Sequence, residues 1–228
     1  MKMDKLAGNI WLLAYPLKTL GVDIRRNVTV IRLESGRLVI HSTAPFSQED
    51  IAKIRGLGEP GWLVEGMVDH DTFSKEGREA FPGIPFLAPP GFSGRVDFEV
   101  RDLNSPPSEW LPELEVIPIE GAPKMAESVL FHRPSGTLVV CDLLFNFPEI
   151  DSMWSKVLLT MVLGTDPAPG FSKRVKMAIK DDAAFAASLE KVKALPVQRI
   201  VPGHGVPLVE NAKERMEKLF SGKFPGSG

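Results

Sequence analysis

Three short segments constrain the fold of this chain most, because each places a residue that can bind metal directly after an apolar stretch. Residues 62–68 lead into Asp69 and His70, residues 137–141 lead into Asp142, and residues 197–201 lead into the turn Pro202-Gly203-His204-Gly205. Glycine turns that follow buried strands direct side chains into pockets. We therefore expect the side chain of His204 to point into a pocket.

Local patterns add strands and helices but leave their layering open. Residues 28–33 and 37–41 flank a short glycine-containing turn and predict a hairpin. Ser47 and Asp50 have the spacing of a helix start. Further strands are expected at 62–68, 84–88, 114–119, 128–131, 137–141 and 197–201, and helices at 69–81, 149–163, 181–195 and 208–220. This order of elements is compatible with several α/β architectures.

Taken together and in this order, the three segments resemble the metallo-β-lactamase superfamily. The match runs through Val68-Asp69-His70, the hairpin that ends at Asp142, and the loop Gly203-His204-Gly205. The resemblance implies a four-layer αββα sandwich, and we expect one domain across residues 1–228. Residues 131–138 and 142–146 are most similar to an uncharacterised branch of this superfamily, in which the metal signature is commonly degenerate.

The resemblance also implies a metal site that has lost part of its ligand set. Asp69, His70, Asp142 and His204 match the ligands of the second metal in the superfamily, and Asp69 is in addition the candidate catalytic carboxylate. The side chains of His70, Asp142 and His204 are therefore expected to converge on one pocket, although they lie far apart in the sequence. The positions of the first metal's three histidines are instead occupied by Glu65, Met67 and Ala122. The expected cofactor is therefore one divalent ion. An alternative alignment, shifted by one residue, uses His70-Asp71 as the matching residue pair in place of Asp69-His70.

A single ion is chemically reasonable with these side chains. Two imidazoles and two carboxylates suit zinc, iron or manganese, and the two carboxylates neutralise the charge of a dication. If one coordination position stays open, a bound water would have its pKa lowered towards neutrality.

Each candidate ligand also has a structural interpretation. His204 could be a turn residue that hydrogen-bonds the backbone, and Asp142 could cap the turn after its strand. Asp69 could cap the helix that follows it. His41 could either support the metal site from beneath or be an ordinary core histidine.

Other polar residues near these segments carry weaker expectations. Glu65 lies in an apolar stretch, so its carboxylate needs a partner, and Lys124 is the candidate that could replace the missing cation. Cys141 is expected to be a core thiol, because it alternates with Asp142 along its strand. His132 is interpreted as a surface residue of the hairpin turn.

The composition narrows the possible partners. A formal net charge of −2, with scattered basic residues, argues against nucleic acid. The apolar residues 153–163 are too few to span a bilayer, so no membrane association is expected. They predict a helix that packs on the core, covers a substrate or forms a homodimer contact. The single cysteine and the polar first eight residues favour the cytoplasm.

Two functions remain compatible with these residues. The first is a metal-dependent hydrolase that acts on a small ester, thioester or amide. The second is a non-catalytic descendant of the same fold that binds a small ligand or serves as a scaffold. Function resides in the site rather than in the fold, so the sequence leaves both open.

Overall fold

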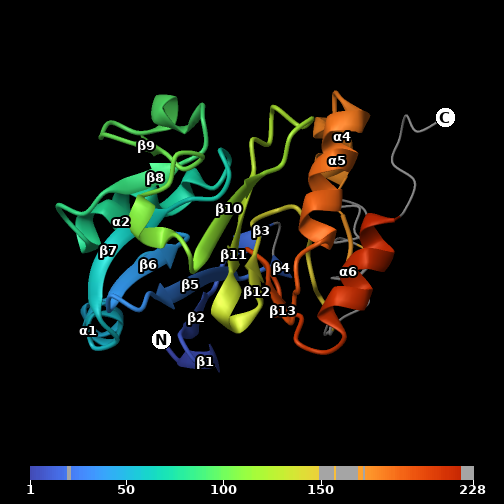
Figure 1. The fold of residues 1–228 in the computed structure, drawn as a ribbon. Coiled ribbons are helices and arrows are strands. Elements are labelled where there is room, and N and C mark those ends of the chain that lie inside the picture. Colours follow the sequence, from blue (N-terminus) through green and yellow to red (C-terminus); the bar gives the residue numbers. More distant parts are fainter. Residues whose placement is uncertain (20–21, 149–156, 158–168, 172, 222–228) are drawn as a thin grey trace.

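The computed structural model describes residues 1–19, 22–148, 157, 169–171 and 173–221 (Figure 1). The helix expected at residues 149–163, with its proposed dimer contact at 153–163, lies outside the described residues except for Val157.

One sheet of seven strands has the order β1-β2-β5-β6-β7-β8-β9. Strands β1 to β6 pair antiparallel, whereas β6 to β9 pair parallel. The strands are β1 (Met3–Ala7), β2 (Ile10–Tyr15), β5 (Arg26–Arg32), β6 (Arg37–His41), β7 (Glu59–Val64), β8 (Phe86–Ala88) and β9 (Arg101–Asp102). A separate two-stranded ribbon pairs β3 (Lys18–Thr19) with β4 (Val22–Asp23).

The second sheet has the order β10-β11-β12-β13. Its strands are β10 (Leu114–Pro118), β11 (Ser128–His132), β12 (Thr137–Val139) and β13 (Arg199–Val201). The first three pair antiparallel, and β12 pairs parallel with β13. The expected hairpins at residues 28–41 and 128–141 are both confirmed.

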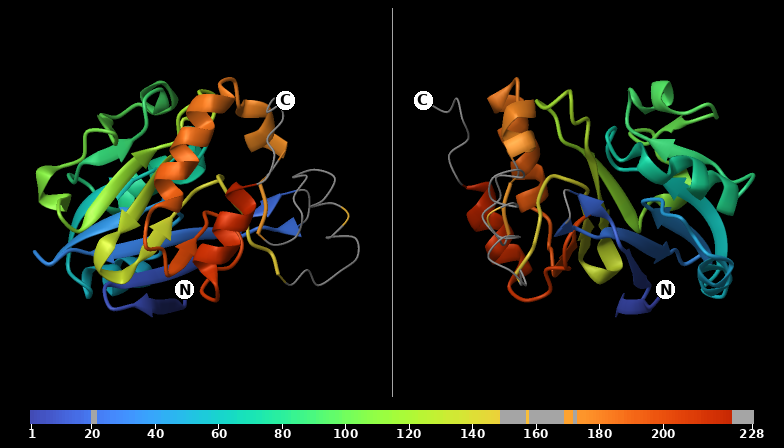
Figure 2. Two further views of the ribbon diagram at one scale, coloured as in Figure 1. Left: turned by 45° about the vertical axis from the view of Figure 1, so that its right-hand side comes forward. Right: turned by 180° about the vertical axis from the view of Figure 1, so that it is seen from behind.

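Helices cover the outer faces of the two sheets (Figure 2). The described helices are α1 (Gln48–Arg55), α2 (Ser74–Ala80), α4 (Lys173–Ala178), α5 (Asp182–Lys193) and α6 (Ala212–Phe220), with 3₁₀ turns η1 (Asp71–Phe73), η2 (Phe92–Arg95), η3 (Ser108–Trp110) and η4 (Arg133–Ser135). Ser47 and Asp50 form the expected capping box of α1. Among the described residues, no helix has the length and apolar character needed to cross a membrane.

Three apolar layers hold this arrangement together. The central layer lies between the sheets and joins Trp62, Val64 and Leu87 of the first sheet to Leu130 and Val139 of the second. One outer layer packs α1 and α2 on the first sheet, and the other packs α5 and α6 on the second. The chain is therefore an αββα sandwich, as predicted, and not a doubly wound parallel sheet.

Several element boundaries differ from the expectation. The last helix begins at Ala212 rather than near residue 208, because Leu208 exchanges two backbone hydrogen bonds with Ile200 and extends the sheet instead. The sequence patterns also missed β1 and β2. Strand β7 stops at Val64, so Glu65 and Met67 lie in the segment that leaves the strand.

Candidate metal centre

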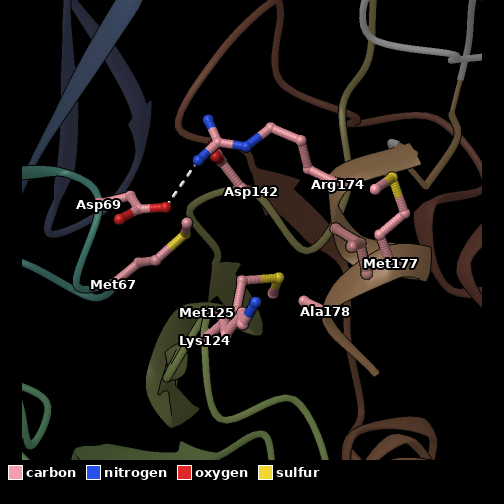
Figure 3. A pocket seen from close by; sticks show the side chains of 9 residues that line it. Met67, Asp69, Lys124, Met125, Asp142, Arg174, Met177 and Ala178 are labelled. Carbon is pink, nitrogen blue, oxygen red and sulfur yellow. Dashed lines mark hydrogen bonds and ion pairs between the residues drawn. The ribbon is translucent and has the colours of Figure 1, made fainter. Parts of the chain in front are cut away.

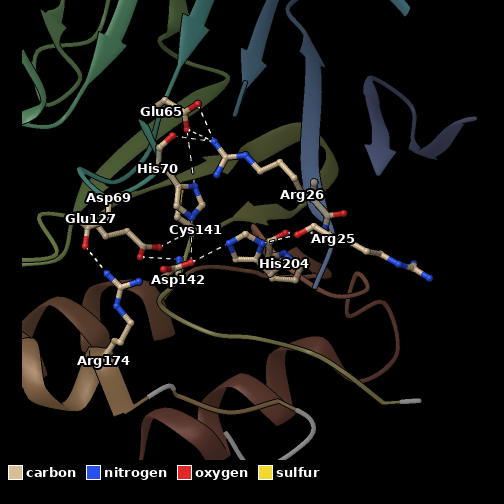
Figure 4. Close-up of polar contacts among 12 residues, drawn as sticks. Arg25, Arg26, Glu65, Asp69, His70, Glu127, Cys141, Asp142, Arg174 and His204 are labelled. Carbon is tan, nitrogen blue, oxygen red and sulfur yellow. Dashed lines mark hydrogen bonds and ion pairs between the residues drawn. The ribbon is translucent and has the colours of Figure 1, made fainter. Parts of the chain in front are cut away.

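The polar residues singled out in the sequence follow the carboxyl ends of parallel strands at one end of the sandwich. His41 ends β6, His70 follows β7, Asp142 follows β12 and His204 follows β13. Neighbouring parallel strands end at the same edge of a sheet, and the two sheets face each other there. The fold thus brings residues from opposite ends of the sequence together (Figure 4).

Three of these side chains form a cluster that could hold a metal ion. Ligand atoms of His70, Asp142 and His204 all lie within 4.8 Å of one another. His70 Nε2 is 3.0 Å and His204 Nε2 is 3.5 Å from Asp142 Oδ1. All three residues are buried.

The orientation of the His204 ring is fixed by the backbone of Arg25. His204 Nδ1 lies 2.5 Å from the carbonyl oxygen of Arg25, and a carbonyl can only accept a hydrogen bond. The ring proton therefore sits on Nδ1. The loop that carries His204 is held in turn by the Asn27 amide, which donates to the carbonyls of Pro202 and Gly205 at 2.8 and 2.9 Å.

This arrangement leaves a lone pair of His204 facing a carboxylate. Burial lowers the pKa of His204, so the ring is neutral near pH 7 and its Nε2 carries no proton. The pKa of Asp142 lies well below its usual range despite burial, mainly because of the His70 ring, whose Nε2 lies within hydrogen-bonding distance of the carboxylate. Two electron-rich atoms thus face each other across 3.5 Å, which fits a cation held between them.

The His70 ring fits the same interpretation. Burial lowers its pKa to about 4, so it too is neutral. Its Nδ1 is buried with no hydrogen-bond partner among the described residues, and it lies 3.9 Å from Glu65 Oε2. A metal on Nε2 would leave the proton on Nδ1, directed towards this carboxylate. Carboxylates commonly orient metal-binding histidines in this way.

Solved structures share this arrangement of sheets and helices over nearly the whole chain. A metallo-β-lactamase from Pontibacter korlensis is 12% identical with a TM-score of 0.61, covering 97% of this chain and 99% of that one. One from Erythrobacter litoralis is 18% identical with a TM-score of 0.63, covering 96% and 91%. The chain has the metallo-β-lactamase fold.

A flavo di-iron protein variant from Thermotoga maritima has the same fold over 60% of its own length. It covers 96% of this chain at 14% identity, with a TM-score of 0.65. No protein-family model matches the sequence, and no curated protein matches it. The metallo-β-lactamase fold is therefore established by structure, and function has to be argued from the site.

Asp69 does not join the cluster. Its carboxylate accepts hydrogen bonds from Arg95 at 2.7 Å and Arg174 at 2.6 Å, and Asp71 also pairs with Arg95. The backbone turn that buries His70 leaves both flanking aspartates at the surface. Neither aspartate therefore belongs to the cluster of His70, Asp142 and His204, whichever of the two registers is used.

Glu65 has a partner, but the expectation of Lys124 was wrong. The Glu65 carboxylate accepts two hydrogen bonds of 2.9 Å from Arg26 and further bonds from the backbone and hydroxyl of Thr43. Burial raises the pKa of Glu65, and Arg26 and Thr43 oppose that shift. Arg26 is itself 2% exposed and also donates to the backbone carbonyl of His70. A buried guanidinium, rather than a lysine, supplies the positive charge beside this carboxylate.

The remaining pocket candidates lie around the cluster without entering it. Met67 and Lys124 line a cavity beside Asp142, whereas Ala122 is buried in the core beneath α5. His41 is buried with its Nε2 3.8 Å from Cys141 Sγ, and burial lowers its pKa to about 3. This contact favours the core interpretation of His41.

Two further expectations are settled by burial. Cys141 is a core thiol, as predicted, and burial raises its pKa. His132 was expected at the surface but is fully buried, because it is the last residue of β11, a strand that is buried along its whole length.

Glu127 was missed in the sequence, although it is central to the site. Its buried carboxylate accepts hydrogen bonds from the backbone N–H groups of Cys141 at 2.7 Å and Asp142 at 3.0 Å. Burial and the charge of Asp142 raise its pKa to about 8. Glu127 therefore holds the backbone that carries Asp142. The available signal was an acidic residue directly before the apolar strand that begins at Ser128.

Proposed function

We propose that His70, Asp142 and His204 bind one divalent metal ion and that the site hydrolyses a small ester, thioester or amide. The observation that carries the proposal is the neutral His204 ring, whose unprotonated Nε2 faces the Asp142 carboxylate at 3.5 Å. Two imidazole nitrogens and one carboxylate form a donor set that suits zinc, iron or manganese. Three protein ligands also leave room for a further ligand, as in catalytic zinc sites.

A divalent ion bound there would supply a water of lowered pKa and polarise a carbonyl group. Residues around the cluster would hold its ligands in place. Arg25 and Asn27 fix the His204 loop, Glu127 fixes the backbone at Asp142, and Glu65 lies behind His70. Asp142 also lines a cavity open to solvent, which gives a substrate access to the cluster.

Hydrolysis at this site would be slow compared with that at a two-metal centre. A second ion would find no imidazole at Glu65, Met67 or Ala122. The Glu65 carboxylate is, in addition, already paired with Arg26. One charge that would stabilise a developing oxyanion is therefore absent. Loss of a single oxyanion donor costs a factor of about 100 or more in other enzymes.

The first experiment measures metal rather than turnover. Metal-free protein is titrated with zinc, iron(II) and manganese(II) by calorimetry, and the bound metal is counted by elemental analysis. We expect one ion per chain, lost in His204→Ala and retained in His132→Asn, which changes a buried histidine outside the cluster. Two tightly held ions per chain, or none, would contradict the proposal.

The second experiment separates the enzyme from the non-catalytic alternative. That alternative is favoured by the three positions without imidazole and by the buried Arg26–Glu65 pair. The metal-loaded protein is tested on a panel of activated esters, thioesters, amides and phosphoesters, with His204→Ala and a chelator as controls. Turnover that both controls abolish supports the hydrolase, whereas one bound ion without turnover on any substrate identifies a ligand-binding protein.

A further inference from the structure

A cavity of about 240 Å³ lies beside the cluster, between the segment after β7, the loop between β10 and β11, and helix α4 (Figure 3). Asp142 lines it and so connects it with the three clustered ligands. Pockets for drug-sized molecules measure about 300–1,000 Å³. The cavity therefore suits a smaller molecule whose reactive part lies at the Asp142 end.

Methionine side chains form much of the apolar surface of this cavity. Met67 and Met125 are almost completely buried, whereas Met177 of α4 is 75% exposed at the edge. Methionine is unbranched and flexible, so it adapts to chains of different shape. A short alkyl chain is the kind of group that these three side chains would contact.

Among the described residues that line the cavity, Lys124 is the cation without an ion pair. Asp69 is paired with Arg174 and Arg95, and Asp142 faces the two imidazoles. Lys124 is exposed, and it forms no ion pair or hydrogen bond with any residue that the structure describes. Figure 3 shows Lys124 and Arg174 reaching the cavity from different elements. The Lys124 ammonium is thus the charge that a ligand would neutralise.

We propose that the cavity binds the acyl part of a substrate with a carboxylate at the end remote from the labile bond. The labile carbonyl would lie at Asp142, the short alkyl chain against the methionines and the carboxylate at Lys124. A carboxylate is favoured over a dianionic phosphate because one ammonium is available and Asp69 and Asp142 are close by. The substrate class is a short ω-carboxy ester or thioester.

Hydrolysis of this substrate rests on the proposed function, whereas its binding does not. In the reaction, the oxygen of water bonds to the carbonyl carbon, the ester C–O or thioester C–S bond breaks, and the alcohol or thiol leaves with a proton. The product is a dicarboxylic acid. Recognition of the remote carboxylate needs no metal, so it can be measured on the metal-free protein.

The test compares two ligands that differ in the remote group alone. Binding of monomethyl adipate and dimethyl adipate to the metal-free protein is measured by NMR titration, which also detects any hydrolysis. An exposed ammonium–carboxylate contact contributes up to about fivefold in affinity. We expect the monomethyl ester to bind about fivefold tighter at low salt and the preference to decrease as salt screens the charges.

Two matched variants locate the preference. Lys124→Gln should bind both esters equally, whereas Lys191→Gln, at an exposed position of α5 that does not line the cavity, should keep the preference. Equal binding of the two esters to the unaltered protein would overturn the proposal. So would a preference that survives in Lys124→Gln, or no binding of either ester. A protein that binds no metal but keeps the preference would contradict the hydrolase proposal alone.

Discussion

His204 donates its Nδ1 hydrogen to the carbonyl oxygen of Arg25, 179 residues earlier in the chain, across 2.5 Å. Arg25 has a left-handed backbone conformation with a φ of 60°, and this turn precedes β5. The backbone of the turn before β5 thus decides which ring nitrogen of His204, in the loop after β13, faces Asp142.

The first prediction concerns this proton. In metal-free protein at pH 7, the ¹⁵N chemical shifts of the His204 ring should show a neutral imidazole protonated at Nδ1. Addition of zinc should shift the Nε2 signal and leave the Nδ1–H in place, because the Arg25 carbonyl still accepts it. A ring protonated at Nε2 in the metal-free protein would contradict the tautomer on which the metal proposal depends.

The second prediction concerns Gly203, which lies against His70. A Cβ atom at position 203 would be 2.8 Å from His70 Cε1 and 3.0 Å from the carbonyl oxygen of Cys141. The ring or the loop has to move, so Gly203→Ala should lower zinc affinity by about tenfold or more, the effect typical of disturbed ligand support. Gly94→Ala is the control, because its Cβ would meet no atom within 4 Å. Equal zinc affinities in calorimetry would contradict the geometry.

The sequence predicted the parts of this molecule that depend on neighbours along the chain. The capping box of Ser47 and Asp50 and the two hairpins need only local hydrogen bonds and alternation, and all formed as expected. The convergence of His70, Asp142 and His204 followed from their positions after strands, once the resemblance had ordered those strands.

The charge partners could not be predicted, because they depend on contacts between distant segments. Glu65 meets Arg26 from 39 residues earlier, and Asp69 meets Arg174 from 105 residues later. No pattern within one strand or helix distinguishes these arginines from the others. Asp69 was consequently assigned to the cluster, although its carboxylate is bound by Arg95 and Arg174 at the surface.

The third prediction tests the buried pair of Arg26 and Glu65. Removing one partner of such a pair leaves an uncompensated buried charge and costs about 3–5 kcal/mol of unfolding free energy. Arg26→Met should therefore be strongly destabilised in urea unfolding, and the double variant Arg26→Met with Glu65→Met should recover much of the loss. If the double variant is as unstable as the sum of the two single variants, the charges are not coupled as the structure shows.

The fourth prediction tests Glu127 as the residue that positions Asp142. Glu127→Ala leaves two buried backbone N–H groups without an acceptor, each at a cost of about 1–3 kcal/mol, and frees the backbone at Asp142. Stability should fall, and zinc affinity should fall by about tenfold or more. Glu127→Gln keeps one acceptor oxygen, so its stability and zinc affinity should lie between those of the unaltered protein and those of Glu127→Ala. Glu214→Ala, at an exposed position of α6, is the control and should change neither stability nor zinc affinity. A Glu127→Ala variant with unaltered zinc affinity would limit Glu127 to a structural role.

The fifth prediction concerns acid stability and uses His132, which is remote from the metal cluster. The ring is fully buried with Nδ1 2.7 Å from Ser135 Oγ, and burial lowers its pKa to about 4. In the unfolded chain the pKa of His132 returns to about 6.5, so unfolding takes up a proton at pH values between the folded and the unfolded pKa. The contribution of the neutral ring to stability is therefore complete above pH 6.5 and is lost as the pH falls towards 4.

Between pH 7 and pH 5 this linkage amounts to about 2 kcal/mol. His132→Asn removes the titrating group, and it leaves the other three buried histidines to contribute equally in both proteins. The unaltered protein should lose about 2 kcal/mol more than the variant when urea unfolding at pH 7 is compared with that at pH 5. Equal losses would mean that His132 is already accessible to protons in the folded state, contrary to its burial at the end of β11.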